Sequence, residues 1–340
     1  MNRNKKSIAI NIKSKQGQDI IYKLIPKVDV LIENFIPGKL ADMGYSYDQL
    51  SKINPKLIYA SMSGWGSTGP MAQQPGYDVM ASAMGGLMHI TGSADVPAKA
   101  GVAITDICTG LYTHGAIIAA LYSRISSGRG QHIESSLLET QVAILANIGQ
   151  NYHIDPSKTG RRLGTAHESI VPYQAFKCSD NKYVIFGALN NRQFQRMCEF
   201  IGKPELATDQ KYLTNQLRVA NRDELITIIQ SCIEHKSSEQ FLHELSTTDI
   251  PHSAINSIDQ VFNNKQVQAR QMIETIQHPT IGKINVTGIP VKFSDTKQSI
   301  RIPPPLHGQH TEEILTEMCG YTKQQCIELE NSGIIKLNSI

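Results

Sequence analysis

Residues 29–61 read DVLIENFIPGKLADMGYSYDQLSKINPKLIYAS, and this stretch decides the fold class. It opens with an apolar run typical of a buried strand, Asp29–Phe35, and breaks at Pro37-Gly38. A helical pattern over Leu40–Ile53 follows, and a second buried strand is expected at Leu57–Ser61. Nearly continuous apolar strands separated by helices are typical of a parallel sheet with helices on its faces. The sequence therefore predicts an α/β fold.

The same alternation extends in both directions from this stretch. Upstream, a strand is expected at Ser7–Ile12 and a helix at Lys15–Ile25. Downstream, Asp106–Ile125 has the small residues of a helix that packs closely against neighbouring backbone. A strand is expected at His132–Leu138, and a long helix then runs to about Tyr152. The first half of the chain is thus predicted to contain one parallel sheet.

The composition is that of an ordinary folded protein. Of 340 residues, 40% are hydrophobic and 19% are charged, and the formal net charge is only +3. This balance lacks the basic footprint of a nucleic-acid-binding protein. The longest uncharged stretches, Ile107–Ser123 and Val79–Ala94, fall short of a membrane span and are expected to form buried core. Neither a nucleic-acid partner nor a membrane partner is expected.

The cysteines and the first residues bear on the compartment. The six cysteines show no CxxC pair and no Cys/His spacing that would indicate zinc or a disulfide framework. A reducing compartment fits this usage best. The N-terminal residues MNRNKK are basic, but neither an apolar signal-peptide run nor an Arg- and Ser-rich transit segment follows them.

A polar segment rich in turn formers, Asp155–Arg162, separates the first half of the chain from a second unit. Beyond it we expect two strands and two helices, at Val171–Phe176, Tyr183–Phe186, Arg192–Ile201 and Arg222–His235. Near the end, a proline run leads into a helix after Gln309-His310-Thr311. We therefore predict a small α+β domain at residues 158–285 and a large domain made of residues 1–157 and 286–340.

The motifs that mark common nucleotide, metal and serine-hydrolase sites are missing. The sequence holds no GxxxxGK[ST], no strand-linked GxGxxG, no HExxH, no GxSxG and no EF-hand loop. What remains is Asp106, an ionisable residue between the weakly polar segments Gly101–Thr105 and Ile107–Gly110. No bound metal is expected.

Two interpretations of Asp106 are open from the residues alone. As an N-cap or first-turn residue, its carboxylate accepts backbone N–H bonds at the start of the following helix. As a nucleophile, a carboxylate with few charged neighbours keeps its reactivity, and covalent catalysis by aspartate is an established mode. Because caps greatly outnumber catalytic aspartates, the residues alone favour the cap.

The sequence resembles the family III CoA-transferases over almost its whole length. Short blocks spread along the chain carry the resemblance: Asn2–Ser7, Glu33–Phe35 with Pro37-Gly38, Gly64–Gly66 with Gly69-Pro70, Gly76–Asp78, Gly86–Gly92, Thr105-Asp106, Gly128–Gln131, Pro172–Gln174 and Gly308–Thr311. The resemblance implies a Rossmann-like large domain, a smaller α+β domain and an interlocked homodimer. The active site would then lie between the large domain of one subunit and the small domain of the other.

The resemblance also implies a reaction, and it reverses the preference for a cap at Asp106. In the family mechanism a carboxylate attacks an acyl-CoA thioester to give an acyl-aspartyl anhydride, which the released CoA converts to an aspartyl-CoA thioester. An acceptor carboxylate attacks that thioester, and CoA returns to the new anhydride. Asp106 would be the nucleophile, with no permanently bound cofactor and with the CoA thioester as substrate. The blocks Gly164–Phe176 and Pro303–Thr311 resemble members that use succinyl-CoA and a dicarboxylate such as glutarate.

The resemblance places the CoA contacts at a strand exit. The family holds CoA where this chain has Asn34 and Phe35, although Phe35 as plain core and Asn34 as a turn residue are the alternatives. A cation is expected near the phosphates, because Arg and Lys bind phosphate by charge-assisted hydrogen bonds. Many relatives carry an Arg a few residues after the Pro-Gly turn, where this chain has Asp42. Lys39 or Arg3 is expected to replace it.

A family loop that closes over the active site matches the residues after the Tyr183–Phe186 strand. Gly187 would give that loop freedom, and Asn190 or Asn191 would supply hydrogen-bond donors. An ordinary strand-to-helix turn with Asn as the cap is the alternative. Arg192 is the candidate for the distal carboxylate of a dicarboxylate acceptor, with a surface charge on a helix as the alternative. His89 and His167 are further candidates, and a structural or substrate-orienting role is expected for each.

Two other functions stay open. An acyl-CoA racemase of the same fold uses a His in the Gly-x-Asp block, where this chain has Tyr77, and a phenol of pKa about 10 is a poor base at neutral pH. Family members carry a further strand, helix and strand before the block at Asn2–Ser7, so an inactive truncated form is the second alternative. The family resemblance implies a mitochondrial location, whereas a chain complete as given is expected to be cytoplasmic.

Overall fold

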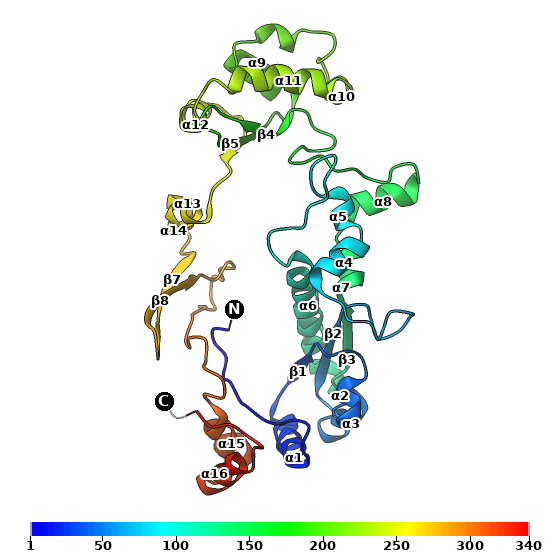
Figure 1. The fold of residues 1–340 in the computed structure, drawn as a ribbon, viewed down its shortest axis with the longest axis vertical. Helices are drawn as coiled ribbons and strands as arrows, with labels where there is room; N and C mark the ends of the chain where they lie inside the picture. Colours follow the sequence, from blue (N-terminus) through cyan, green and yellow to red (C-terminus); the bar gives the residue numbers. More distant parts are fainter. Residues whose placement is uncertain (1, 339–340) are drawn as a thin grey trace. The chain divides into compact units, whose positions relative to one another are not determined.

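The computed structural model describes residues 2–338, and the chain separates into two compact units. Met1–Ile90, Ala98–Gly160 and Ile273–Ile340 form the first unit, and Thr91–Pro97 with Arg161–Met272 form the second. Figure 1 follows the chain through both units. The domain limits expected from the sequence, with residues 158–285 as the small domain, stay a prediction.

The first unit is built on a three-stranded parallel sheet. Its strands are β1 (Val30–Glu33), β2 (Ile58–Ser63) and β3 (His132–Ser136), in the order β1-β2-β3. Val30 is in register with Ile58, and Tyr59 with His132. The α/β fold with a parallel sheet is thereby confirmed.

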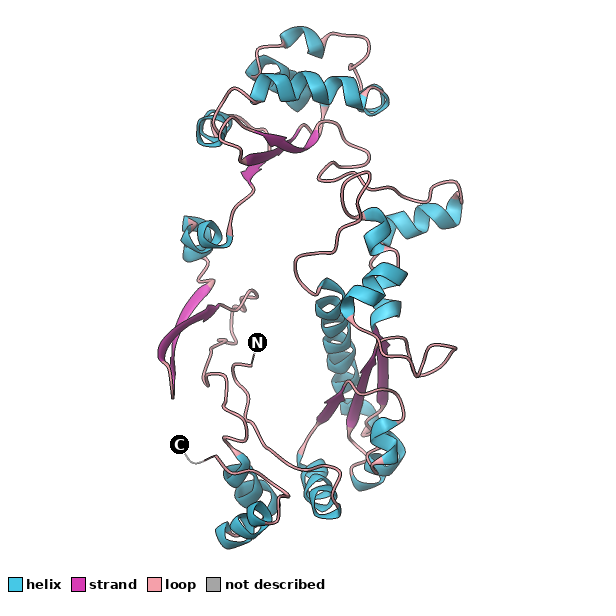
Figure 2. Cartoon of the chain, in the orientation of Figure 1, coloured by secondary structure: helices cyan, strands magenta, loops and turns pink. Residues whose placement is uncertain are grey.

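Ten α-helices accompany this sheet among the described residues of the first unit (Figure 2). They are α1 (Lys15–Leu24), α2 (Lys39–Asp42), α3 (Tyr47–Ile53), α4 (Asp78–Met84), α5 (Leu87–Ile90), α6 (Ile104–Ser127), α7 (Leu137–Ala143), α8 (Ala146–Ile154), α15 (Thr311–Cys319) and α16 (Lys323–Asn331). Two helices expected to be continuous are each divided. Gly44, at φ 88°, separates α2 from α3, and Ala146, at φ 50°, lies where α8 begins.

The two faces of the sheet are covered differently. On one face, Tyr59 and Leu31 pack with Tyr45 and Leu50 in an apolar cluster. Side chains alternate along a strand, so Ser135 points to the opposite face from His132. There the Ser135 hydroxyl lies 2.7 Å from that of Thr113 on α6. Helix α6 therefore covers the second face.

The expectation that the uncharged stretch in α6 is buried core is wrong. Leu111, Tyr122 and Ile125 are 65%, 78% and 81% exposed, and a Cβ added at Gly110 would meet nothing within 4 Å. The buried side of the helix is instead formed largely by threonines, Thr105, Thr109 and Thr113. By length and composition alone, α6 also meets the criteria for a membrane-spanning helix.

The expectation of a sheet strand at Ser7–Ile12 is also wrong. Ile10 forms only an isolated antiparallel bridge with Ile335, and the Ala9 N–H donates to Thr311 Oγ1 at 3.0 Å. Ile8 and Ile10 pack instead against a cluster formed by α1, α15 and α16, which includes the buried Ile20, Leu315 and Cys326. The apolar alternation therefore faces the C-terminal helices rather than a neighbouring parallel strand.

The second unit has the α+β character expected from the sequence. Its antiparallel sheet has the order β4-β5-β6, and Figure 2 shows helices packed along it. The elements are β4 (Tyr173–Lys177), β5 (Tyr183–Gly187), α9 (Asn191–Phe200), α10 (Asn215–Ala220), α11 (Arg222–Ile233), α12 (Ser238–Leu245), β6 (His252–Ala254), α13 (Ile258–Asn263) and α14 (Lys265–Ala269). Phe176, Phe186, Phe194 and Phe241 form much of its core. The hairpin β7 (Ile273–His278) and β8 (Gly282–Thr287) follows and groups with the first unit.

Candidate active site

Asp106 lies in the first turn of α6, but it does not cap that helix. The N-cap position is Ala103, and the capping carboxylate comes from another helix. Asp78, the first residue of α4, accepts hydrogen bonds from the backbone N–H groups of Thr105 at 2.9 Å and Asp106 at 3.2 Å. Asp106 is therefore not the N-cap, but its expected first-turn position at the positive end of the helix is confirmed, and the residue is exposed.

A buried hydrogen-bond network holds this first turn in place. The Thr105 hydroxyl donates to Gln141 Oε1 at 2.7 Å and lies 2.8 Å from the Ser82 hydroxyl. All three side chains are buried, and they come from α6, α7 and α4. Because buried polar groups are costly to leave unpaired, this network fixes the backbone next to Asp106.

The surroundings of Asp106 change its proton affinity. Burial, and secondly the negative charge of Asp78, raise the pKa of the Asp106 carboxyl above its ordinary value. A carboxylate with a raised pKa is more basic than free aspartate once it is ionised. The position therefore combines exposure with enhanced basicity, two properties that suit a nucleophile.

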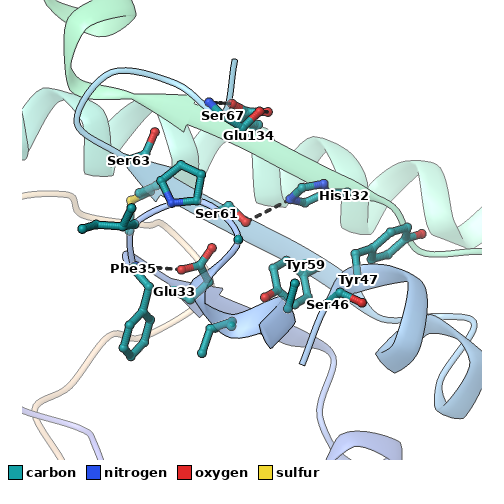
Figure 3. A pocket seen from close by; sticks show the side chains of 16 residues that line it. Glu33, Phe35, Ser46, Tyr47, Tyr59, Ser61, Ser63, Ser67, His132 and Glu134 are labelled. Atoms are coloured by element: carbon teal, nitrogen blue, oxygen red, sulfur yellow. Dashed lines mark hydrogen bonds between the residues drawn. The ribbon is translucent and has the colours of Figure 1, made fainter. Parts of the chain in front are cut away.

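A separate pocket of the first unit lies beside the turns that follow β1 and β2, and it extends to His132 at the start of β3 (Figure 3). Its volume is about 150 Å³, and it includes Phe35, Tyr47, Tyr59, Ser61 and His132 among its lining residues. The His132 ring stacks on Tyr47 at 5.6 Å between centroids, and its Nε2 lies 2.9 Å from the Ser61 hydroxyl. The carboxyl ends of parallel strands are the usual ligand-binding edge of such sheets.

Two carboxylates of this pocket are used to hold neighbouring turns. Glu134 accepts hydrogen bonds from the Ser67 backbone N–H at 2.6 Å and from its hydroxyl at 2.7 Å. Glu33 accepts the Phe35 N–H at 2.7 Å, as the dashed line in Figure 3 shows. No lysine or arginine lines the pocket. Its hydroxyl and aromatic lining therefore suits an uncharged part of a ligand better than a phosphate.

The residues expected to bind CoA are only partly brought together. Phe35 lines the pocket, whereas Asn34, Lys39 and Asp106 are not among its lining residues. Lys39 begins α2, and Arg3 donates to the Thr287 carbonyl at 2.5 Å. The choice of phosphate-binding cation stays a prediction. Within residues 2–338, no three His, Cys, Asp or Glu side chains gather as a metal site.

In the second unit, the expected loop residues have local structural partners. Gly187 ends β5, where an added Cβ would lie 3.0 Å from the Tyr173 ring. Asn190 caps α9 by accepting the Gln193 N–H at 2.9 Å, so the alternative of Asn as a helix cap is confirmed for this residue. Arg192 Nη2 lies 4.0 Å from the Oδ2 atom of Asp249.

His167 is stacked parallel to Tyr173, with 5.4 Å between the ring centroids. Its Nδ1 accepts the Ser169 N–H at 3.1 Å. This bond makes Nδ1 the acceptor, so a neutral His167 carries its proton on Nε2. An exposed donor on a ring held by stacking fits the expected substrate-orienting role, which stays a prediction.

A polar clamp formed by Asn215, Arg218 and Arg222 holds the backbone around His167. Asn215 Nδ2 donates to the Ser169 carbonyl at 2.7 Å, and Arg218 Nε donates to the Val171 carbonyl at 2.8 Å. Arg222 Nη2 donates to the carbonyls of His167 at 2.9 Å and Glu168 at 2.6 Å. The clamp residues follow one another at helical spacing, so one side of the α10–α11 segment fixes the whole segment 167–171.

Arg218 connects this segment with the turn that carries Asn190 and Asn191. Its guanidinium is fully buried, Nη1 donates to Asn191 Oδ1 at 3.1 Å, and the group lies 4.3 Å from the centre of the Phe194 ring. Burial lowers the pKa of Arg218. The two candidate loops of the second unit are thus joined through one buried side chain.

The chain belongs to CoA-transferase family III. The profile of that family matches residues 1–311, which is most of the chain. The protein is therefore an enzyme of the CoA-transferase class, as the sequence blocks indicated.

Particular relatives narrow the resemblance. The succinyl-CoA:glutarate CoA-transferase of Mus musculus is 47% identical over 337 residues, covering 99% of this chain and 77% of the relative. The Homo sapiens enzyme of that name is 46% identical, with 98% and 76% covered. The crystal structure of a CAIB/BAIF family protein from Brucella suis aligns with a TM-score of 0.83 at 37% identity, over 93% of this chain and 82% of that one.

Sequence reasoning missed Asp78 and the polar clamp. Asp78 lies in the block Gly76–Asp78, but its partners, the Thr105 and Asp106 N–H groups, lie 27 and 28 residues further along the chain. The structure shows Tyr77 64% exposed, immediately before α4. The clamp had a signal in its helical spacing, yet its partners are backbone carbonyls of another segment, which no pattern in the sequence identifies.

Proposed function

We propose that this enzyme transfers CoA from succinyl-CoA to glutarate or a similar dicarboxylate, with Asp106 as the nucleophile. The observation that carries the proposal is that Asp78 and Asp106 have different roles at the start of α6. Asp78 satisfies the first-turn N–H groups of α6, so the Asp106 carboxylate stays exposed and available to attack. The names of the mouse and human relatives, at 47% and 46% identity, support the choice of donor and acceptor.

The proposed chemistry needs only a carboxylate, a thioester and an acceptor acid. An Asp106 oxygen attacks the succinyl carbonyl, the C–S bond breaks, and CoA leaves as a thiolate. The thiolate then attacks the Asp106 carbonyl of the mixed anhydride, which releases succinate and leaves an aspartyl-CoA thioester. Glutarate attacks that thioester and frees the thiolate again. Attack of the thiolate on the glutaryl carbonyl yields glutaryl-CoA and regenerates Asp106.

Asp78 acts as a positioning residue in this scheme. It holds the Asp106 backbone, and its charge adds to the effect of burial in raising the pKa of Asp106. Asn34, Phe35 and Lys39 remain the proposed CoA contacts. Of these, Phe35 has the direct support that it lines the pocket beside the turns that follow β1 and β2.

We also infer that the enzyme works as a homodimer. The exposed apolar stripe on α6, which includes Leu111, Ile118, Tyr122 and Ile125, supports this inference, because contiguous apolar surface is typical of an interface. Sedimentation of the purified protein tests it: a monomer at micromolar concentration would contradict the dimer. The mitochondrial location implied by the resemblance stays a prediction.

The central test is trapping during turnover. Hydroxylamine added with succinyl-CoA should convert the activated Asp106 carboxyl to a hydroxamate, which mass spectrometry locates by its peptide. Turnover of succinyl-CoA and glutarate without modification of Asp106 would contradict the covalent route. A racemase would instead exchange the α-proton of a 2-methylacyl-CoA with solvent deuterium, and this assay separates the alternative class directly.

A further inference from the structure

The second unit contains an open cavity where α11 begins. Its volume is about 390 Å³, and it is lined by Arg161 together with residues 219–224, including Arg222. Cavities that bind small molecules commonly have volumes of 300 Å³ or more. None of the sequence motifs or the proposed catalytic steps uses this cavity.

Arg222, which lines this cavity, has donor groups that make no hydrogen bond within the described chain. Its Nη2 is used by the carbonyls of His167 and Glu168, but Nε and Nη1 are buried and have no hydrogen-bond partner among residues 2–338. An arginine side chain stays protonated in proteins, so it cannot remove the need for acceptors by losing a proton. Buried donors without acceptors are unfavourable, so the Arg222 guanidinium gains hydrogen bonds if it turns toward an anionic oxygen in the cavity.

A second guanidinium adds to the positive charge. Arg161 is exposed and forms no ion pair with a carboxylate in the described part of the chain. After burial, proximity to Arg161 is the largest influence on Arg222, and it lowers the pKa of that group. Arg161 and Arg222 line the same cavity, and an anion bound between them would offset the repulsion of their positive charges.

Two carboxylates, Asp223 and Glu224, also line the cavity. Glu224 is occupied by Lys211, at 2.7 and 2.9 Å from its two oxygens. Asp223 and Glu168 each raise the pKa of Arg222 less than Arg161 lowers it. The N-cap side chain, Asn221, is also turned away from the helix start, because its Nδ2 donates to the carbonyls of Lys211 and Leu217.

We propose that this cavity binds an oxyanion of a substrate, a carboxylate or a phosphate, between Arg161 and Arg222. The inference rests on the proposed function, which supplies both kinds of oxyanion. One source is the distal carboxylate of the dicarboxylate acceptor, and the other is the 3′-phosphate of CoA. The sequence candidate for the distal carboxylate, Arg192, lies 4.0 Å from Asp249, which also pairs with Arg196, and the role of Arg192 stays a prediction.

The test uses Arg161→Gln, because Arg161 holds no backbone carbonyl of the 167–171 segment whereas Arg222 does. Two ratios of kcat/KM are measured: glutarate over pentanoate, which lacks the distal carboxylate, and succinyl-CoA over its 3′-dephospho analogue. We expect at least one ratio to fall about tenfold or more, as loss of a charge-assisted contact implies. Arg161→Lys should restore part of the loss, and Arg270→Gln, an exposed arginine outside the cavity, should change neither ratio.

The outcomes separate the possibilities. A fall confined to the first ratio identifies the acceptor carboxylate, and a fall in the second identifies the CoA phosphate. If the wild-type enzyme is active and Arg161→Gln leaves both ratios unchanged, the inference is overturned. It is also overturned if the glutarate-to-pentanoate ratio falls in Arg192→Gln but not in Arg161→Gln. If the wild type transfers no CoA, the proposed function fails, and calorimetry with glutarate and with CoA still tests the cavity. Equal or absent binding in wild type and Arg161→Gln then overturns it.

Discussion

The carboxylate of Asp78 accepts the backbone N–H of Asp106 at 3.2 Å, so one aspartate holds the main chain of the other. The two carboxylates are thereby given different tasks. Asp78 is half-buried and satisfies the helix start, whereas Asp106 is exposed and has its pKa raised by burial and by the charge of Asp78. Pairs of carboxylates whose environments differ in this way are typical of sites where only one of them reacts.

Asp106→Asn is expected to lower kcat at least a thousandfold while leaving the fold intact. An amide oxygen cannot form the anhydride, and water cannot replace the nucleophile in this route. Because Asp106 is exposed and does not cap α6, the change in the thermal unfolding midpoint should be no larger than that caused by an ordinary surface substitution. Steady-state assays and thermal unfolding check both statements. Residual activity within tenfold of wild type would contradict the role.

Asp78→Asn is expected to move the acid limb of the kcat/KM profile to lower pH. The reactive form of Asp106 is ionised, and its raised pKa places the loss of activity at a higher pH than for free aspartate. Asparagine keeps an oxygen acceptor for the two N–H groups but removes the negative charge, so the pKa of Asp106 falls. An unshifted limb would show that Asp78 acts through the backbone alone.

Thr105→Val is expected to destabilise the protein by about 1–3 kcal/mol, because it leaves the buried Gln141 and Ser82 groups without their partner. Thr109→Val is the matched control. Thr109 is equally buried on the same helix, but its hydroxyl donates only to the Thr105 carbonyl. That carbonyl lies within the helix and also takes part in its backbone hydrogen bonds. Urea unfolding compares the two variants. Equal destabilisation would mean that the network around Thr105 contributes nothing specific.

Local patterns were sufficient to predict most of the elements that surround these sites. The apolar runs at β1 and β2 and the helix over residues 15–24 follow from periodicity and end signals close in sequence. The start of α15 at Thr311 likewise follows the Gln309-His310-Thr311 signal. These predictions succeeded because each signal and its partner lie within a few residues.

The failures share a physical cause, which is a partner distant in sequence. The alternation at Ser7–Ile12 indicated a strand, but its cover comes from residues around 311–335. Asp106 looked like a cap because the competing cap, Asp78, stands 28 residues earlier. Small residues such as Gly110 suggested close packing, yet the threonine side of α6 faces the sheet. In each case periodicity gave the local conformation, and it did not identify the partner.

Arg218→Met is expected to destabilise the second unit by about 2–4 kcal/mol. Methionine fills most of the space of the side chain, but the carbonyls of Val171 and Tyr212 then lose their donor, and each buried acceptor left unpaired costs about 1–3 kcal/mol. Removing a buried charge offsets part of this loss, since the Arg218 guanidinium has no carboxylate partner in the described chain.

Hydrogen exchange can locate that effect, because a chain of two units need not unfold in one step. Backbone amides of β4 and β5 should lose protection from exchange in Arg218→Met. Trp65 is the single tryptophan and lies in the first unit, so its fluorescence should report an unchanged unfolding midpoint for that unit. Arg270→Met, at an exposed position of the second unit, is the control and should alter protection little. If amide protection in Arg218→Met equals or exceeds that of wild type, the cost of burying the guanidinium exceeds the stabilisation by its hydrogen bonds. The two candidate loops then do not depend on Arg218 for their positions.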